Sequence, residues 1–293
     1  MELRVLQYFL AVAREQSISA AAESLHLTQP TLSTQLRAME DELGKQLLIR
    51  GAKGSRRVLL TEEGMILRKR AEEILALVQR TEEEIMHDDE AVVGDVYIGA
   101  GETDIVRLLA RAAREIQKQH PDIRYHISSG NAEHVLEQLD KGLIDFGLLF
   151  GRTDTQKYEA LPLPGKDTWG VLMRRDVPLA EKASVAPGDL LEKPLILTDQ
   201  PDDAQLLTRW LSPAGSAPHV VATYNLVYNA SLLVDEGLGY ALCLDRLINT
   251  DGSRLCFLPF SPPLESAASL VWKKYPAFSK AARTFLSCLR GLL

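Results

Sequence analysis

Two kinds of side chain near the N-terminus have the chemistry to bind the phosphates and the base edges of DNA. Between residues 45 and 60 the chain carries five basic residues and no acidic one: Lys45, Arg50, Lys53, Arg56 and Arg57. Short hydroxyl and amide side chains precede them, over residues 28–35. Basic groups neutralise phosphates, and short polar groups can hydrogen-bond base edges at close approach. A solvated loop would also explain the basic run if it stood alone.

The charge of the chain is unevenly distributed. The 293 residues have a net charge of −7, which is unusual for a protein that binds DNA. Residues 1–61 hold eight basic and six acidic residues, a net charge of +2, which leaves −9 for the remainder. A basic patch on an acidic protein binds phosphates locally while the rest stays in solution. The length predicts two or three domains, each able to bury a core of its own.

Three helices are expected in the first 45 residues. Apolar residues recur at helical spacing over residues 3–15. Ser17 and Ser19 are expected to cap a short second helix. Thr28 is expected to cap a third helix, with Pro30 in its first turn and Gly44 just past its end.

The third helix has two different faces. Its apolar face carries Leu32, Leu36, Met39 and Leu43. On a helical wheel the opposite side carries short polar groups and one arginine; these residues are Pro30, Ser33, Thr34 and Arg37. A three-helix bundle with a solvated face would show the same periodicity, so periodicity alone does not predict DNA recognition.

The order of residues along the chain is more specific than the helical periodicity. The segments Ser17–Leu25, Thr28–Leu36 and Met39–Gly44 closely resemble the DNA-binding signature of LysR-type regulators, and Leu47–Arg50 and Leu60–Gly64 continue it in order. The match covers about the first 65 residues. Two features depart from the family: Leu48 stands where the family usually has Phe, and the wing, Gly51–Leu59, is about three residues longer.

This resemblance implies a winged helix-turn-helix whose third helix enters a major groove. By matching position, the residues that approach bases are Gln29, Pro30, Thr31, Ser33 and Gln35. Those that lie near the DNA backbone are Thr34, Arg37 and Arg50, and Ser19 is included among the DNA-binding residues. A basic residue of the wing reaches the minor groove, and the longer wing leaves Lys53, Arg56 and Arg57 as alternatives.

A long helix is expected from Glu62 to about His87. A heptad seam runs along it, at Leu67, Ala71, Ile74, Val78, Thr81 and Ile85. Such a seam is typical of helix pairing, although a helix packed on its own domain would also show it. We expect pairing between two chains, in agreement with the family's dimerising linker helix. Residues 88–90, all acidic, are expected to end this helix.

The second half of the chain alternates strands with helices, which predicts a parallel α/β sheet. The first five elements are expected at residues 92–100, 106–118, 123–127, 132–139 and 144–150. Further elements are expected at 165–173, 194–198, 205–211, 219–223, 226–235, 240–244, 255–258, 269–272 and 278–292.

Motifs in this half resemble the regulatory domain of LysR regulators. They include Ile98–Gly101, Pro121–Ile123, Ser129–Asn131 and Gly142–Gly147, with Tyr224–Asn225 and Gly237–Ala241 in a second lobe. The resemblance implies a two-lobed α/β fold like that of periplasmic solute-binding proteins, with crossovers near residues 161–164 and 262–266. The expected domains are therefore 1–61 (winged helix-turn-helix), 62–88 (linker helix) and 89–293 (regulatory domain). Lobe I spans about 89–161 and 267–293, and lobe II about 162–266.

A ligand of an open α/β sheet binds outside the carboxyl ends of its strands. The residues expected there are Gly101, Glu102, Thr103, Ser128, Ser129, Phe150, Thr198, Thr223 and Asn225. Each hydroxyl is equally well explained as a helix cap. Helix N-termini favour an anion, whereas Glu102 and Asp104 would repel one. Our hypothesis is a polar, carboxylate-bearing effector.

Other functions have weaker support. The motifs of serine hydrolases, zinc proteases and nucleotide-binding loops are missing, so an enzyme is not expected. Cys243, Cys256 and Cys288 do not have the spacing of a zinc site or a disulfide framework. No cofactor is expected, and no signal peptide or membrane span is recognised, which favours the cytoplasm. The expected partners are promoter DNA, a second copy of the chain (a dimer, and a tetramer by resemblance), RNA polymerase and a small-molecule effector. The alternative is a cytoplasmic solute-binding protein or an enzyme with an added DNA-binding domain.

Overall fold

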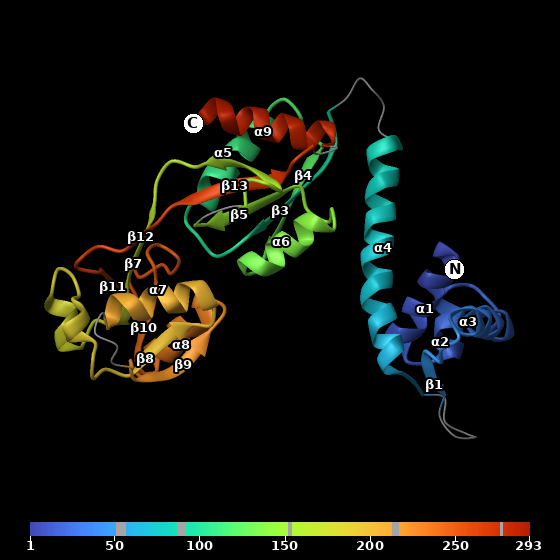
Figure 1. Cartoon of the computed structure of the whole chain (residues 1–293), viewed down its shortest axis with the longest axis horizontal. Coiled ribbons are helices and arrows are strands. Elements are labelled where there is room, and N and C mark those ends of the chain that lie inside the picture. Colours follow the sequence, from blue (N-terminus) through green and yellow to red (C-terminus); the bar gives the residue numbers. More distant parts are fainter. Residues whose placement is uncertain (51–56, 87–91, 152–153, 213–216, 276–277) are drawn as a thin grey trace. The chain divides into compact units, whose positions relative to one another are not determined.

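The computed structural model describes residues 1–50, 57–86, 92–151, 154–212, 217–275 and 278–293. The chain divides into two compact units, Met1–Asp88 and Asp89–Leu293, and each is described by itself (Figure 1). The expected end of the linker helix at residues 88–90 lies outside the described residues.

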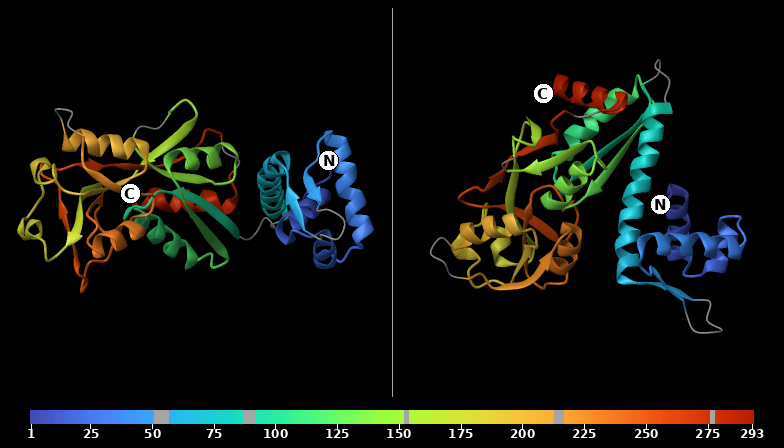
Figure 2. Two further views of the ribbon diagram at one scale, coloured as in Figure 1. Left: turned by 90° about the horizontal axis from the view of Figure 1, so that it is seen from below. Right: turned by 45° about the vertical axis from the view of Figure 1, so that its right-hand side comes forward.

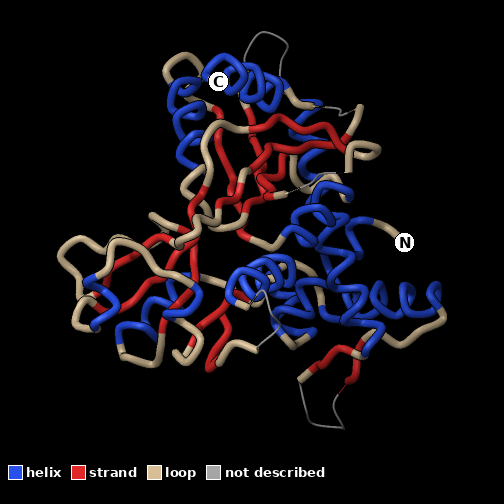
Figure 3. The backbone as a smooth tube through the Cα atoms, turned by 60° about the vertical axis from the view of Figure 1, so that its left-hand side comes forward, coloured by secondary structure: helices blue, strands red, loops and turns tan. Residues whose placement is uncertain are grey.

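The first unit is a small helical bundle with a two-stranded hairpin. It contains α1 (Leu3–Glu15), α2 (Ile18–Ser24), α3 (Gln29–Leu43), β1 (Leu48–Arg50), β2 (Val58–Leu60) and α4 (Glu62–Met86). The antiparallel β1–β2 hairpin is visible beside the helices in Figure 3.

Side-chain caps fix where α2 and α3 begin. Ser17 caps α2 by accepting a hydrogen bond from the backbone N–H of Ala20, and Thr28 caps α3 in the same way through Thr31. Gly44 ends α3 in the left-handed conformation, with φ of 63°. The expectation that Ser19 is a cap was wrong, because Ser19 lies inside α2 and a single residue supplies the cap.

The first half of α4 belongs to the core of its own unit. Ala71 has no exposed surface, and Leu67 and Ile74 pack against the same core. Ala71 is therefore buried within its own unit, which corrects its assignment to the dimer contact. Leu67 and Ile74 contact the same core but are only partly buried, so their place in the pairing seam stays a prediction. Further along α4, Val78 is half-buried, whereas Ile85 is 77% exposed.

Lobe I of the second unit is a five-stranded sheet in the order β4-β3-β5-β13-β6. Its strands are β3 (Gly94–Ala100), β4 (Ile123–Ser129), β5 (Phe146–Phe150), β6 (Tyr158–Pro162) and β13 (Ala268–Lys273). Helices α5 (Val106–Gln117) and α9 (Lys280–Leu292) cover one face, and α6 (Ala132–Asp140) covers the other (Figure 1).

Lobe II has a sheet in the order β11-β7-β10-β8-β9, with β12 (Glu265–Ser266) paired to β7. The strands are β7 (Asp167–Arg174), β8 (Leu195–Thr198), β9 (Val220–Tyr224), β10 (Tyr240–Leu244) and β11 (Leu255–Pro259). Helix α7 (Pro201–Leu211) packs on one face and α8 (Val227–Asp235) on the other. Two short 3-10 helices, Pro178–Glu181 and Pro187–Asp189, follow β7.

The two lobes are connected by two chain crossovers, seen in Figure 2 as the segments that pass between them. One leads from β6 to β7, and the other leads from β11 through β12 to β13. The expected parallel sheet was correct in part: β3 is parallel to β4 and β5, and β8 is parallel to β9 and β10. Both sheets are nevertheless mixed, because β13 is antiparallel to β5 and β10 is antiparallel to β7. The chain must return to lobe I from lobe II, and β13 therefore enters that sheet from the opposite end.

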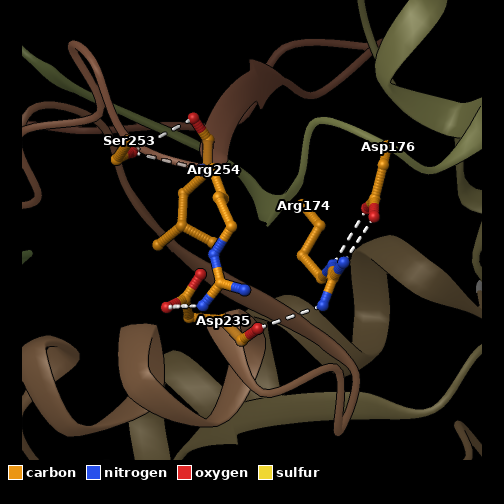
Figure 4. Close-up of polar contacts among 6 residues, drawn as sticks. Arg174, Asp176, Asp235, Ser253 and Arg254 are labelled. Atoms are coloured by element: carbon orange, nitrogen blue, oxygen red, sulfur yellow. Dashed lines mark hydrogen bonds and ion pairs between the residues drawn. The ribbon is translucent and has the colours of Figure 1, made fainter.

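A polar network fastens the C-terminal end of α8 to lobe II (Figure 4). Arg174 donates to both carboxylate oxygens of Asp176 and, over 3.3 Å, to the backbone carbonyl of Asp235 at the last turn of α8. Arg254 donates to the Asp235 carboxylate over 2.7 Å. Cations at a helix C-terminus complement its dipole, so this end of α8 is held by lobe II while its other end faces lobe I.

Candidate functional site: a DNA-reading helix and a junction between lobes

The polar face of α3 is open to solvent. Its exposed residues are Gln29, Pro30, Thr31, Thr34, Gln35 and Arg37, which we call the recognition surface. Ser33 lies beside them and is half-buried, and Ser19 on α2 is exposed. The opposite face of α3 holds Leu32, Leu36 and Met39 in the core. Burial of one face therefore fixes which polar groups α3 presents.

The carboxylate of Glu40 ties α3 to the hairpin. One of its oxygens accepts hydrogen bonds from the backbone N–H groups of Leu47 and Leu48, over 2.8 and 3.0 Å. The other accepts one from the guanidinium of Arg50 over 3.2 Å. Arg50 is half-buried as a result, so a structural contact occupies part of the group that we expected near the DNA backbone.

The wing residues fall into two groups. Arg57 is exposed immediately before β2. Lys53 and Arg56 lie outside the described residues. The adjoining N–H of Val58 donates to the carbonyl of Gln16 at the end of α1, over 2.8 Å, which fixes where β2 leaves the bundle.

Gly64 allows α4 to pass close to the hairpin. A Cβ at this position would lie 2.2 Å from the backbone oxygen of Leu47. The hydroxyl of Thr61 holds the same turn by accepting from the Gly64 N–H over 3.0 Å and donating to the carbonyl of Gln46 over 2.7 Å. The Thr61–Gly64 motif of the sequence is therefore where the hairpin joins α4.

Two side-chain hydrogen bonds join the lobes of the second unit at the carboxyl end of β3. The carboxylate of Glu102 accepts a hydrogen bond from the N–H of Val227, the first residue of α8, over 2.7 Å. The hydroxyl of Thr103 donates to the buried carboxylate of Asp167 at the start of β7. We call these two contacts the lobe junction. Burial raises the pKa of Asp167, and the hydrogen bond from Thr103 partly opposes that rise.

The two threonines expected to bind an effector are already hydrogen-bonded. Thr103 also accepts from the Ile105 N–H over 3.0 Å, at the start of α5. Thr198 is buried and accepts from the Gln200 N–H over 3.1 Å, ahead of α7. Each hydroxyl therefore holds the turn ahead of its helix. Neither is the side-chain helix cap that the sequence also suggested, because the capping residues are Ile105 and Gln200.

The other expected effector residues have more accessible side chains. Ser128, Ser129, Thr223 and Asn225 are exposed at the ends of β4 and β9. Phe150 is partly buried and packs against the cores of both lobes. Gly101 is half-exposed beside Glu102.

Sequence reasoning missed the partners in the lobe junction. Asp167 is 64 residues from Thr103, and Val227 is 125 residues from Glu102. Asp104 was expected to repel an anion, but it pairs with Arg107 over 2.5 Å and with Arg246 over 3.7 Å. In the sequence, Asp167 is a single aspartate ahead of the apolar residues of β7. This local pattern does not indicate which residue Asp167 contacts.

Family models match nearly the whole chain. Residues 3–65 match the bacterial regulatory helix-turn-helix protein of the lysR family, and residues 90–293 match the LysR substrate binding domain. The chain therefore belongs to the LysR family of transcription regulators. It is a DNA-binding transcription regulator rather than an enzyme, as the sequence predicted.

Individual relatives have the same organisation. The chain is 28% identical over 279 residues to the hydrogen peroxide-inducible genes activator of Pectobacterium carotovorum, covering 93% of this chain and 90% of that protein. It is 28% identical over 299 residues to the Hca operon transcriptional activator HcaR of Escherichia coli, covering 100% and 98%.

The fold matches a solved regulator over its full length. The structure of full-length CbnR complexed with its target DNA aligns with a TM-score of 0.79 at 21% identity and covers 100% of both chains. This likeness confirms the expected fold class, a winged helix-turn-helix with a long helix followed by a two-lobed α/β domain. Among the described residues, every helix is too short or too polar to cross a membrane.

Proposed function

We propose that a small polar effector binds between the two lobes and alters how the regulator binds its promoter. The observation that carries this proposal is the contact of Glu102 with the N–H of Val227. A helix N-terminus attracts anions, and here a carboxylate of the other lobe occupies that position. An effector carboxylate can replace the Glu102 side chain there, and the distance between the lobes then depends on the ligand.

The charges near this position are compatible with an anionic effector. Asp104 is paired with Arg107 and Arg246. The polar side chains that orient the effector are those of Ser128, Ser129, Thr223 and Asn225. Phe150 supplies an apolar surface. Gly101, Thr103 and Thr198 then shape the backbone around the ligand. Effector binding biases the lobes between two arrangements.

The DNA-binding residues are assigned by position. Gln29, Pro30, Thr31, Ser33 and Gln35 contact bases, and Ser19, Thr34, Arg37, Arg50 and Arg57 contact the DNA backbone or the minor groove, with Lys53 and Arg56 in the wing. Two copies of the chain read a pseudo-palindromic site. The proposed domains are 1–61 for DNA binding, 62–88 for the linker helix and 89–293 for regulation. The proposed location is the cytoplasm, and RNA polymerase is a proposed partner.

Pairing of the copies is proposed along the far half of α4. Val78 and Ile85 of the seam lie beyond the part of α4 that packs on its own core, and Ile85 is largely exposed. Leu77 adds exposed apolar surface in the same half. The regulatory domains then assemble dimers into tetramers.

Thiol oxidation is the alternative signal to consider, because a relative of this chain is named a hydrogen peroxide-inducible genes activator, but the cysteines of this chain do not favour it. The reactive form of cysteine is the thiolate. Burial raises the pKa of Cys243 to about 12 and also raises the pKa of Cys256 and Cys288. These thiols stay protonated near pH 7, which favours a bound effector. Hydrogen peroxide should therefore leave promoter binding unchanged.

A ligand screen tests the proposed effector. Carboxylate, cationic and apolar metabolites are screened by thermal shift, and each ligand found is titrated by calorimetry into the full-length protein and into Asn225→Ala and Glu102→Gln. Asn225→Ala should weaken binding, whereas Glu102→Gln should tighten it about fivefold, because a neutral acceptor competes less well for the Val227 N–H. Footprints and DNA bend angles should then change with ligand. Binding of cationic or apolar ligands alone, or identical footprints with each ligand, would refute the proposal.

A further inference from the structure

A cavity of about 280 Å³ lies beside the lobe junction, and none of the proposed effector residues lines it. Its walls come from residues 104–111 at the start of α5 in lobe I, from residues 164–168 at the first crossover, and from residues 245–246 after β10 in lobe II. Pockets for drug-sized ligands start at about 300 Å³. This cavity therefore suits a small metabolite or ion that contacts both lobes at once.

The walls carry an excess of positive charge on a protein of net charge −7. Four basic side chains line the cavity: Arg107, Arg111, Lys166 and Arg246. Three acidic ones accompany them: Asp104, Asp167 and Asp245. Asp104 is only 18% exposed and is held between Arg107 and Arg246. Asp167 is buried, and its carboxylate accepts from Thr103. Asp245 is 39% exposed and pairs with Arg246 over 3.7 Å. All four basic side chains are exposed, so the accessible groups at the rim are mainly cationic.

Arg111 is the most available of these cations. It is exposed, lines the cavity, and forms no ion pair with any residue that the structure describes. It follows Arg107 by one helical turn on α5, and like charges at this spacing destabilise a helix. An anion shared by the two guanidinium groups removes that repulsion. Arginine binds carboxylate and phosphate through paired hydrogen bonds.

We infer that this cavity binds a small anion with a carboxylate or phosphate group, held by Arg111 and Arg107 of lobe I and by Arg246 of lobe II. Lys166 contributes a further positive charge from the crossover, where it pairs with Glu265 over 2.7 Å. Because the side chains that hold the anion come from both lobes, the bound anion favours one arrangement of the lobes. It is a second input, separate from the effector site beside Glu102.

Calorimetry on the full-length protein tests this site with two probes, inorganic phosphate and succinate, at constant ionic strength set with sodium chloride. At least one probe should bind saturably, once per chain, with a Kd of about 1 mM or tighter. Arg111→Gln should weaken that binding about tenfold or more, the loss expected for a charge-assisted bidentate contact. The probe that binds identifies the anionic group.

Arg114→Gln is the matched control, since Arg114 is an exposed arginine of the same helix that does not line the cavity. It should bind the probe as the native protein does, and thermal unfolding verifies that both variants fold. Asn225→Ala should also leave the affinity unchanged. The inference is overturned if neither probe binds saturably, if Arg111→Gln and Arg114→Gln weaken binding equally, or if Asn225→Ala abolishes it, because the anion would then occupy the effector site.

Discussion

The recognition surface of α3 and the lobe junction use polar side chains in opposite ways. On α3 the polar groups are exposed, and the core holds only the other face of the helix. At the lobe junction, Glu102 and Thr103 are already bound to groups of the other lobe. The DNA contact proposed for α3 requires groups that are accessible before binding, whereas the effector response proposed for the lobe junction requires contacts that a ligand can replace.

The largest effect that separates the two regions is expected from Gly64→Ala. The new Cβ would lie 2.2 Å from the Leu47 oxygen, so the hairpin or α4 must shift. We expect the first unit to lose about 3 kcal/mol of stability and DNA binding to fall with it. Chemical denaturation followed by DNA titration measures both losses.

The control for this substitution is Gly188→Ala in the second unit. A Cβ there meets no atom within 4 Å, so stability and DNA binding should stay unchanged. Equal behaviour of the two variants would show that the passage of α4 beside the hairpin is not tightly constrained.

A smaller, pH-dependent effect is expected at the lobe junction from Asp167→Asn. Burial raises the pKa of Asp167 in the folded chain, so the folded state holds the proton more tightly than the unfolded state does. The native carboxyl therefore contributes most stability below its ordinary pKa and loses that contribution as pH rises through the folded pKa. The amide, which does not ionise, should raise the Tm at pH 7 by roughly 2–4 °C.

Thermal unfolding between pH 4 and pH 7 measures this difference, which should shrink toward the acidic end. Asp122→Asn removes an exposed carboxylate and serves as the control. If Asp167→Asn were less stable than the native protein at pH 7, the ionised carboxylate would be the favoured partner of Thr103.

The smallest effect is expected in the network at the end of α8. Arg254 is 64% exposed where it pairs with Asp235, and exposed ion pairs contribute little. Arg254→Ala should change the free energy of unfolding by less than about 0.5 kcal/mol. A larger loss in denaturant titration would show that Arg174 and Arg254 act together to hold α8.

The difference between the two regions also explains what the sequence could predict. The start of α3 depends on neighbours along the chain, namely the Thr28 cap, Pro30 and the spacing of the apolar residues, and it was predicted correctly at Gln29. The recognition surface followed from the same local pattern. Ser19 was misplaced because two serines in a row of small residues offer two equivalent caps.

Local sequence patterns could not predict the contacts between distant segments. Strand β6 was missed because its residues, Tyr158–Pro162, are mostly exposed and have no apolar run. Mixed sheet direction was missed because it depends on the return of the chain from lobe II. Thr103 and Asp167 are brought together only by the lobe arrangement, and the cavity beside Arg111 needs three separate segments to form.

We expect the recognition surface to read base sequence, and fluorescence anisotropy can measure this preference. A duplex from the promoter beside the protein's own gene is titrated against a scrambled duplex at fixed salt, with the native protein, Gln29→Ala and Arg37→Ala. We expect Gln29→Ala to lower the preference for the promoter about tenfold, the value of one good base contact. Arg37→Ala should weaken binding to both duplexes equally. An unchanged preference in Gln29→Ala, or a native protein that binds both duplexes alike, would show that the recognition surface does not read base sequence.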